Sequence, residues 1–216
     1  MNVYCFPGLG ANERIFEKVR LPEGYKKVCV SWKEPGKKES LESYAFRLVE
    51  EVDLSQDYIL MGVSFGGMIC TVLNDLLKPK KAILISSITG RNELPWYFRA
   101  SGRMKLNSLL HMKTALKAAP FALDIMGART PEEKEFLREM VNQASVNLVQ
   151  WSIDKILNWE NRKRPENVVQ IHGNKDMVLP HTYTHVDHII DNGNHFLIRN
   201  KADELNQIIS TILKSE

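Results

Sequence analysis

The stretch Tyr58-Ile59-Leu60-Met61-Gly62-Val63-Ser64-Phe65-Gly66-Gly67-Met68 decides the fold, because a hydrophobic strand runs into the pattern G-x-S-x-G and then into an apolar helix. A serine on a sharp turn between a strand and a helix needs glycines two residues before and two residues after it. A Cβ atom at either place would collide with neighbouring backbone. The context predicts that Ser64 is an exposed nucleophile, and the alternative is an ordinary glycine-rich turn.

Short apolar runs rich in β-branched residues alternate with amphipathic stretches along most of the chain, which is typical of a parallel sheet covered by helices. The pattern predicts strands over residues 2–6, 26–32, 58–63, 81–87, 167–172 and 185–190. The spacing of apolar residues predicts helices over 11–19, 41–53, 66–77 and 196–213. We therefore expect an α/β protein with a mostly parallel sheet of about six strands.

This alternation stops after Ile88. Residues 91–165 contain no convincing strand and are expected to form several helices, one of which begins at Thr130 with a capping residue and a first-turn proline. We expect a core of residues 1–90 and 166–216, interrupted by a helical insertion of residues 91–165. The length of 216 residues suits one core with an insertion better than two domains.

Composition and motifs argue against several classes of protein. A formal net charge of +3 is too small and too evenly spread for a nucleic-acid-binding protein. The six histidines form no H-x-x-x-H or H-E-x-x-H pattern, so we expect no metal. The chain has no phosphate-binding P-loop, and Gly8-Leu9-Gly10 lacks the third glycine of a dinucleotide fingerprint.

The cellular location is predicted from the absence of two kinds of segment. No apolar run is long enough to span a membrane, and the chain begins with a strand rather than with a basic and apolar leader. Cys5, Cys29 and Cys70 lie in apolar stretches without pairing or metal-ligand spacing, which predicts reduced, buried thiols. A reactive cysteine is the alternative. These features predict a cytoplasmic protein.

Two downstream residues could activate the serine. A serine hydroxyl is a weak nucleophile at neutral pH, so it needs a base and an acid that orients this base. Asp176 follows the predicted strand 167–172, where the loops of an open α/β sheet gather at the ligand edge. His195 follows the last predicted strand, where the closing helix begins. The chain order is therefore Ser, Asp, His.

Other residues compete for these roles. His172, at the end of a predicted strand beside Gly173, is an alternative base, but this position is more typical of a structural turn. Asp124 lies in the insertion, and Asp187 and Asp191 flank the last predicted strand, so we expect these three aspartates to be solvated charges. The remaining alternatives are that Asp176 only shapes a loop turn and that His195 only caps a helix.

The chain resembles the α/β-hydrolase superfamily over nearly its whole length. The resemblance rests on the order of its elements: a strand, G-x-S-x-G, a helix, a helical insertion, a strand that ends in H-G-x-x-D, and a late G-N-H-F. The resemblance implies that Ser64 is the nucleophile and that His195 is the general base and then the general acid. It implies that Asp176 fixes the imidazole tautomer and stabilises its charged form. The expected activity is hydrolysis of a small-molecule carboxylic ester or thioester through an acyl-enzyme, without a cofactor.

The resemblance also implies an oxyanion hole made by two backbone amides, which map to Phe65 and Leu9. Many relatives begin the second loop with His-Gly, whereas this chain has Pro7-Gly8, so the hydrogen bonding inside the loop is expected to differ. The first predicted strand, 2–6, stands where larger relatives have already formed two antiparallel strands. We therefore expect a trimmed, six-stranded version of the fold.

In this superfamily a helical lid forms the roof of the acyl pocket, so residues 91–165 are expected to control the substrate. Residues 91–130 contain seven basic and two acidic residues, a net charge of +5. We expect a solvated helical face, and the alternative is that this charge favours an anionic substrate such as a carboxylated ester or a coenzyme A thioester. Trp96, Tyr97 and Phe98 would line an apolar pocket or pack the lid onto the core.

Several functions remain open at this point. A serine nucleophile argues against haloalkane dehalogenases and epoxide hydrolases, which use aspartate at this place. Lactone opening, carbon–carbon bond hydrolysis and acyl transfer all use the same triad. A catalytically silent binding protein would keep the fold, although it has no chemical need for the three groups together. An aromatic oligomer interface on the lid is compatible with any of these.

Overall fold

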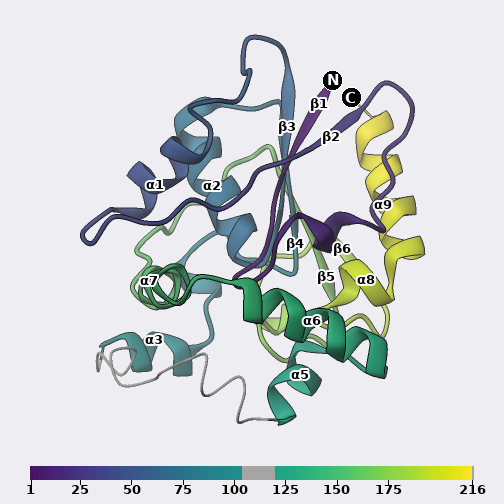
Figure 1. Cartoon of the computed structure of the whole chain (residues 1–216). Helices are drawn as coiled ribbons and strands as arrows, with labels where there is room; N and C mark the ends of the chain where they lie inside the picture. The colour runs from purple at the N-terminus through teal and green to yellow at the C-terminus, as the bar shows by residue number, and fades with distance from the viewer. Residues whose placement is uncertain (104–119, 216) are drawn as a thin grey trace.

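The computed structural model describes residues 1–103 and 120–215, in which six strands form one parallel sheet (Figure 1). The strands are β1 (Asn2–Phe6), β2 (Lys26–Cys29), β3 (Tyr58–Val63), β4 (Lys81–Ile85), β5 (Val168–Gly173) and β6 (His188–Ile190). Their order in the sheet is β2-β1-β3-β4-β5-β6, and every neighbouring pair is parallel. The predicted α/β class and six-stranded parallel sheet are confirmed.

The two faces of the sheet bury different sets of side chains, because successive residues of a strand point to opposite faces. Leu60 of β3 belongs to the apolar core shared with the helices α1 (Leu41–Leu48) and α2 (Phe65–Leu77). Ile59 and Met61 belong to the core shared with α8 (Leu197–Asn200) and α9 (Ala202–Lys214). Burial on both faces explains why β3 is apolar along its whole length.

The segment between β4 and β5 is helical wherever the structure describes it. It contains the 3-10 helix η2 (Arg91–Glu93) and the helices α3 (Trp96–Arg103), α5 (Pro120–Met126), α6 (Pro131–Gln143) and α7 (Val146–Leu157). Residues 91–103 and 120–165 include no strand. The predicted helix start at Thr130 is confirmed, since its side chain and that of Glu133 form a reciprocal capping box.

Strand register places the loops of the site at one edge of the sheet. Phe6 of β1 lies opposite Gly62 of β3, and Val63 lies opposite Ile85 of β4. The carboxyl ends of these strands are therefore level, and the loops that follow them meet at the same edge. Figure 1 shows α3, α5, α6 and α7 along this edge.

Several predicted elements are shorter than expected. The predicted strands 26–32 and 185–190 shrink to β2 and β6, the two edge strands, each of which has a single neighbour to pair with. The predicted helix 11–19 is only the 3-10 helix η1 (Glu13–Phe16), and a second 3-10 helix, η4 (His181–Tyr183), lies between β5 and β6. Helix α1 ends at Leu48 rather than at residue 53, and the closing helix 196–213 breaks at Lys201.

Among the helices of residues 1–103 and 120–215, none combines the length and the apolar character that crossing a membrane requires.

Candidate active site

Ser64 lies on a strained turn between β3 and α2. Its backbone angles, φ 52° and ψ −119°, are rare for a residue with a side chain and are typical of functional turns. A Cβ atom on Gly62 would clash with the carbonyl of Gly66, and one on Gly66 would clash with the carbonyls of Phe6 and Pro7. The predicted requirement for two glycines is therefore confirmed, and its cause is the close approach of backbone.

Hydrogen bonds from the neighbouring strand hold this turn. The Ser64 amide donates to the carbonyl of Ile85 at 2.9 Å, and the Ser64 carbonyl accepts from the hydroxyl of Ser87 at 2.6 Å. Both partners lie at the end of β4 or just after it. The strained backbone of Ser64 is thus supported by β4.

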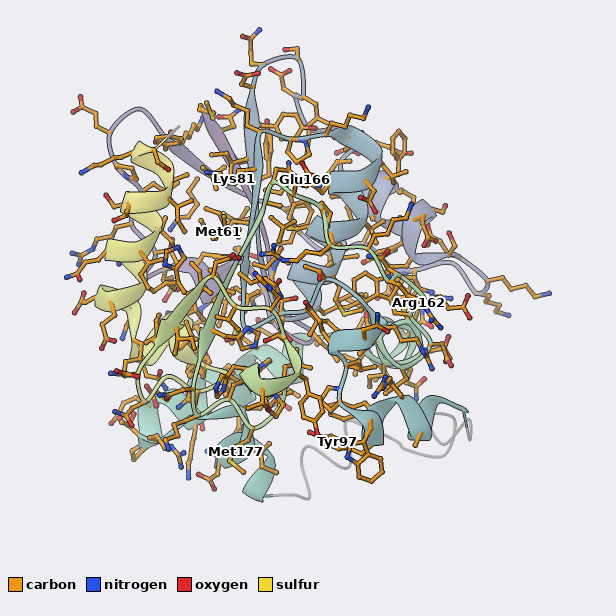
Figure 2. The ribbon with its side chains drawn as sticks, turned by 180° about the vertical axis from the view of Figure 1, so that it is seen from behind. Met61, Lys81, Tyr97, Arg162, Glu166 and Met177 are labelled. Atoms are coloured by element: carbon orange, nitrogen blue, oxygen red, sulfur yellow. The ribbon has the colours of Figure 1, made fainter. Side chains whose placement is uncertain are left out.

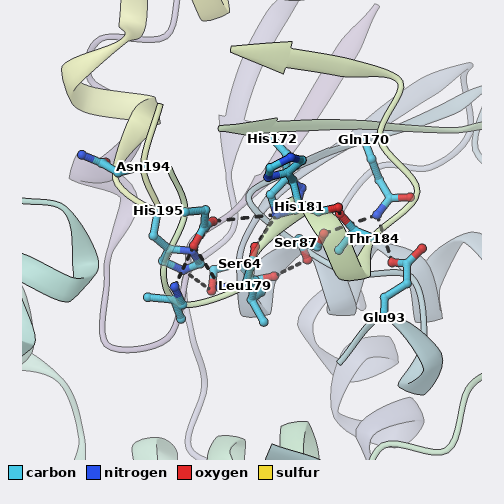
Figure 3. A network of polar contacts seen from close by, with 12 residues as sticks. Ser64, Ser87, Glu93, Gln170, His172, Leu179, His181, Thr184, Asn194 and His195 are labelled. Atoms are coloured by element: carbon cyan, nitrogen blue, oxygen red, sulfur yellow. Dashed lines mark hydrogen bonds and ion pairs between the residues drawn. The ribbon is translucent and has the colours of Figure 1, made fainter. Parts of the chain in front are cut away.

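The structure brings Ser64, His195 and Asp176 into one hydrogen-bonded chain. Nε2 of His195 lies 3.0 Å from Oγ of Ser64, and Nδ1 lies 2.8 Å from Oδ2 of Asp176 (Figure 3). His195 is 4% exposed and Asp176 is 5% exposed. A proton on Nδ1 that is donated to Asp176 leaves Nε2 as the acceptor for the serine proton.

The Asp176 carboxylate is held by the loop that carries it. Its Oδ1 atom accepts hydrogen bonds from the amides of Val178 and Leu179, both at 2.9 Å. Burial raises the pKa of Asp176, but the charge and hydrogen bond of His195, with help from the Leu179 amide, outweigh burial and hold this pKa below its ordinary value. The carboxylate is therefore ionised at neutral pH.

His172 contacts the same loop rather than the serine hydroxyl. Its Nε2 atom lies 3.0 Å from the carbonyl oxygen of Leu179 and 3.7 Å from Oδ2 of Asp176. Burial lowers the pKa of His172 to about 4, so the ring is neutral and Nε2 donates to Leu179. Within the described residues its Nδ1 atom has no hydrogen-bond partner. This geometry favours the structural role over that of a base.

The other aspartates have partners of their own. Asp187 accepts from the guanidinium of Arg164 and from the amide of Gln170, at 2.5 and 2.8 Å, with a half-buried side chain. Asp187 thus ties β5 to the loop before β6, while the residue as a whole stays exposed. Asp124 forms an ion pair with Lys134, and Asp191 accepts from Asn174.

Phe65 and Leu9, whose amides are predicted to form the oxyanion hole, both line the cavity that contains Ser64. Phe65 is the first residue of α2, where helix amides have no carbonyl of their own helix to bind. Gly8 packs against Ser64, since its Cβ position would lie 3.5 Å from the serine Cβ, and Leu9 follows it. Gly8, Leu9, Ser64 and Phe65 all line the same cavity. Trp32 supports this loop by donating its indole N–H to the carbonyl of Ala11.

A polar network that the sequence analysis missed links the serine turn to the insertion. The side-chain amide of Gln170 donates to the carbonyl of Ser87 at 3.3 Å and to the carboxylate of Glu93 at 3.0 Å (Figure 3). Glu93 also accepts from the amide of Thr89 at 2.7 Å. The available signal was Gln170 itself, a polar residue inside the apolar strand Val168-Val169-Gln170-Ile171.

The cavity above Ser64 has a volume of about 410 Å³ and an almost entirely apolar wall. Side chains of the helical insertion supply much of this wall. They are Phe98 of α3, Leu123 and Met126 of α5, Leu137, Met140 and Val141 of α6, and Val149, Gln150, Ile153, Ile156 and Leu157 of α7.

For the basic residues of the insertion a solvated face was favoured over a substrate contact, and for its aromatic residues packing onto the core was favoured over lining a pocket. Arg91, Arg99 and Arg129 do not line the cavity, and the guanidinium of Arg91 donates to the carbonyl of Trp159. The side chains of Arg103, Lys105, Lys113 and Lys117 lie outside the described residues. Of the three aromatics, Phe98 lines the cavity, while Trp96 is 63% exposed and Tyr97, labelled in Figure 2, is 39% exposed.

The cysteines depart from the expectation in one respect. Cys5 and Cys70 are buried, but Cys29 is half-buried and lies directly opposite Cys5 on the neighbouring strand. The expectation of burial is wrong for Cys29, because its strand β2 lies at the edge of the sheet, but Cys29 is a free thiol as expected. No group of three or more His, Cys, Asp or Glu side chains in residues 1–103 and 120–215 is arranged to hold a metal ion.

Known proteins match this geometry only at the level of structure. No family model matches the chain, and no curated protein matches its sequence. A thermophilic esterase from Thermogutta terrifontis superposes with a TM-score of 0.75 at 14% identity, covering 100% of this chain and 90% of that one. An esterase from Exiguobacterium antarcticum superposes with a TM-score of 0.71 at 17% identity, covering 99% and 92%.

A thioesterase, RedJ, from the prodiginine biosynthetic pathway of Streptomyces coelicolor superposes with a TM-score of 0.66 at 16% identity, covering 98% of this chain and 90% of that one. The protein has the α/β-hydrolase fold. Fold alone does not decide the reaction, so the chemistry is argued from the site.

Proposed function

We propose that the protein is a serine hydrolase that cleaves a carboxylic ester or thioester through an acyl-enzyme on Ser64. The observation that carries this proposal is the hydrogen-bonded chain from Ser64 through His195 to Asp176 at the floor of an apolar cavity. Esterases and a thioesterase among the similar structures support the same class. The cavity would receive the acyl substrate.

In the proposed acylation step, Oγ of Ser64 attacks the carbonyl carbon while Nε2 of His195 takes its proton. Asp176 stabilises the imidazolium that forms, since its carboxylate is ionised and lies 2.8 Å from Nδ1. The amides of Leu9 and Phe65 stabilise the oxyanion of the tetrahedral intermediate. Nε2 then returns the proton to the departing alcohol or thiol, which leaves the acyl group on Ser64.

In the proposed deacylation step, His195 takes a proton from a water molecule that attacks the acyl-enzyme carbonyl. The bond to Ser64 breaks, Nε2 returns the proton to Oγ, and a carboxylic acid is released. Lactone opening, carbon–carbon bond hydrolysis and acyl transfer to another nucleophile remain alternatives with the same residues. In each of these the Ser64 hydroxyl must still be activated.

The domain organisation belongs to the same proposal. We propose that residues 91–165 act as a lid over a catalytic core of residues 1–90 and 166–216. Support comes from the cavity wall, much of which is supplied by α6 and α7 of this segment. A cytoplasmic location completes the proposal, and fractionation of the native cell tests it.

Labelling with a fluorophosphonate probe, read by intact mass, tests the proposal. We expect one adduct on the wild type and none on Ser64→Ala or His195→Ala, because only an activated serine reacts. Ser210→Ala on α9 is the matched control and keeps the adduct, since this serine does not line the cavity. Absence of an adduct on folded wild type would contradict the proposal and favour the binding-protein alternative.

A further inference from the structure

The cavity above Ser64 carries information about the substrate that the triad does not. Three of its described lining residues, Ser64, Gln150 and His195, have polar side chains. Two of these belong to the proposed triad, and Gln150 is an exposed residue of α7. The rest of the wall is hydrocarbon, thioether sulfur, aromatic ring or backbone.

We infer that the acyl group is an uncharged aliphatic chain of medium length, about eight to twelve carbon atoms. This inference rests on the proposed function and names its substrate class. The cavity of about 410 Å³ has room for about a dozen non-hydrogen atoms, since a methylene group takes up ~30 Å³, the same as a molecule of liquid water. An acetyl group would leave most of this apolar space unfilled.

Charge complementarity argues against a second carboxylate on the chain. A carboxylate in this wall would lose its hydration without gaining a cation, because no lysine or arginine is among the described lining residues. Of the arginines next to lining residues in the sequence, Arg199 pairs with Glu17, and Arg99 does not line the cavity. Arg91 donates to the Trp159 carbonyl, and Arg14 pairs with Glu139.

The wall is also adaptable. Met68, Met126 and Met140 come from three different helices and line the cavity together. Unbranched thioether side chains adjust to irregular apolar shapes at little cost, so chains of neighbouring lengths should be accepted. We therefore expect a broad optimum over medium lengths rather than selection of one length.

The first experiment measures kcat/KM of the wild type on p-nitrophenyl esters and on N-acetylcysteamine thioesters from acetyl to palmitoyl. We expect kcat/KM to rise by up to about fourfold per methylene as the chain fills the cavity, to peak between octanoyl and dodecanoyl, and to fall at palmitoyl. For the monoester of a medium-length dicarboxylic acid, kcat/KM should be at least about 100-fold lower than for the uncharged ester of the same length. An optimum at acetyl or butyryl would overturn the inference.

A cavity-filling variant tests whether these walls set the length. Ile153→Trp places a large ring in the wall contributed by α7 and should shift the optimum to shorter chains, lowering the ratio of kcat/KM for decanoyl to that for butyryl by at least about tenfold. Val146→Trp is the matched control, since Val146 lies on the same helix, is 45% exposed and does not line the cavity. Circular dichroism checks that both variants fold. An unchanged ratio in folded Ile153→Trp would overturn the inference.

Binding to Ser64→Ala separates this inference from the proposed function. Calorimetry on this variant should show tighter binding of p-nitrophenyl decanoate than of p-nitrophenyl acetate, without turnover. If the wild type hydrolyses no ester or thioester but Ser64→Ala keeps this preference, the proposed hydrolase function fails and the ligand class stands. If Ser64-dependent hydrolysis occurs without a preference for medium chains in rate or binding, the ligand class fails and the hydrolase function stands.

Discussion

Oδ2 of Asp176 accepts a hydrogen bond from Nδ1 of His195 at 2.8 Å, while its Oδ1 atom accepts the amides of Val178 and Leu179. Both oxygens are thus occupied by donors, and the carboxylate cannot rotate without losing one set of bonds. The loop therefore orients the aspartate, and the aspartate orients the imidazole towards Ser64. Substitution of Asp176 should act on the tautomer of His195 more than on the fold.

Asp176→Asn should lower kcat by about 10⁴-fold, because an amide that donates to Nδ1 favours the wrong imidazole tautomer. Kinetics on a medium-chain ester measure this loss. Asp191→Asn is the control, since Asp191 lies in the loop after β6 and bonds only to Asn174 in the described network. An equal loss in both variants would mean that the pairing of Asp176 with His195 is not what matters.

Leu9→Pro should cost about 10² to 10³ in kcat, because proline removes the backbone N–H proposed to stabilise the oxyanion. Leu9→Ala keeps this N–H and serves as the comparison. Its kcat should be at least about 100-fold higher than that of Leu9→Pro. Both variants are measured on the same ester after their folding is checked by circular dichroism. Similar kcat values for the two folded variants would contradict the assignment of the Leu9 amide.

The stability of the protein should depend on pH through His172. Burial lowers its pKa from the ordinary 6.5 to about 4, so the unfolded chain binds more protons between these values. The free energy of unfolding should therefore fall as the pH decreases from about 6.5 to about 4, by about 3 kcal/mol in total. Asp176, with its lowered pKa, loses its contribution only at more acidic pH.

Urea unfolding of the wild type and of His172→Gln at several pH values measures this effect. A glutamine amide can still donate to the carbonyl of Leu179 but does not titrate. Between pH 4 and 6.5 the slope of the unfolding free energy against pH should therefore be smaller in His172→Gln, by an amount that corresponds to at most one bound proton. Equal slopes for the two proteins would show that His172 is not the group responsible.

Cys29 should be the thiol that reacts with iodoacetamide in the folded protein. A hydrogen bond from Cys5, assisted by the charge of Lys27, lowers the pKa of Cys29 to about 7, and the residue is half-buried. Burial raises the pKa of Cys70, and the neighbouring Cys29 and burial together raise that of Cys5. Mass spectrometry should find one alkylated cysteine, with a rate that increases through pH 7.

Cys29→Ser should abolish this fast alkylation, while unfolding in urea should expose every remaining thiol. Fast modification of Cys70 in the folded protein would contradict the prediction, since that side chain is fully enclosed.

Much of the fold was predictable because its constraints are local. The Ser64 turn depends on clashes between residues at most four positions apart, such as Gly62 and Gly66, and on the adjacent strand β1. The capping box at Thr130 and Glu133 spans a single helical turn. The full burial of β3 required only its unbroken apolar run. Apart from the contact of Gly66 with β1, the deciding contacts lie close together in sequence, so the residue pattern reports them.

Contacts between distant segments were less predictable. Cys29 lies beside Cys5 only because β2 pairs with β1 in this register. Gln170 reaches Glu93 only because β5 pairs with β4, the strand that the insertion follows. His195 lies 131 positions from Ser64 in the sequence. No local pattern pairs the two residues, and the prediction of this pair came from the resemblance to the α/β-hydrolase superfamily.

The sequence by itself determined the α/β class, the serine turn and the order Ser, Asp, His along the chain. Tertiary structure alone decided that the described part of the cavity wall is apolar and that Arg91, Arg99 and Arg129 of the insertion do not line it. The physical reason is that composition reports how much charge a helix carries, whereas packing decides which of its faces meets the cavity. Helices α6 and α7 turn leucine, isoleucine, valine and methionine inward over Ser64, and a substrate there would meet these faces rather than the average charge of the segment.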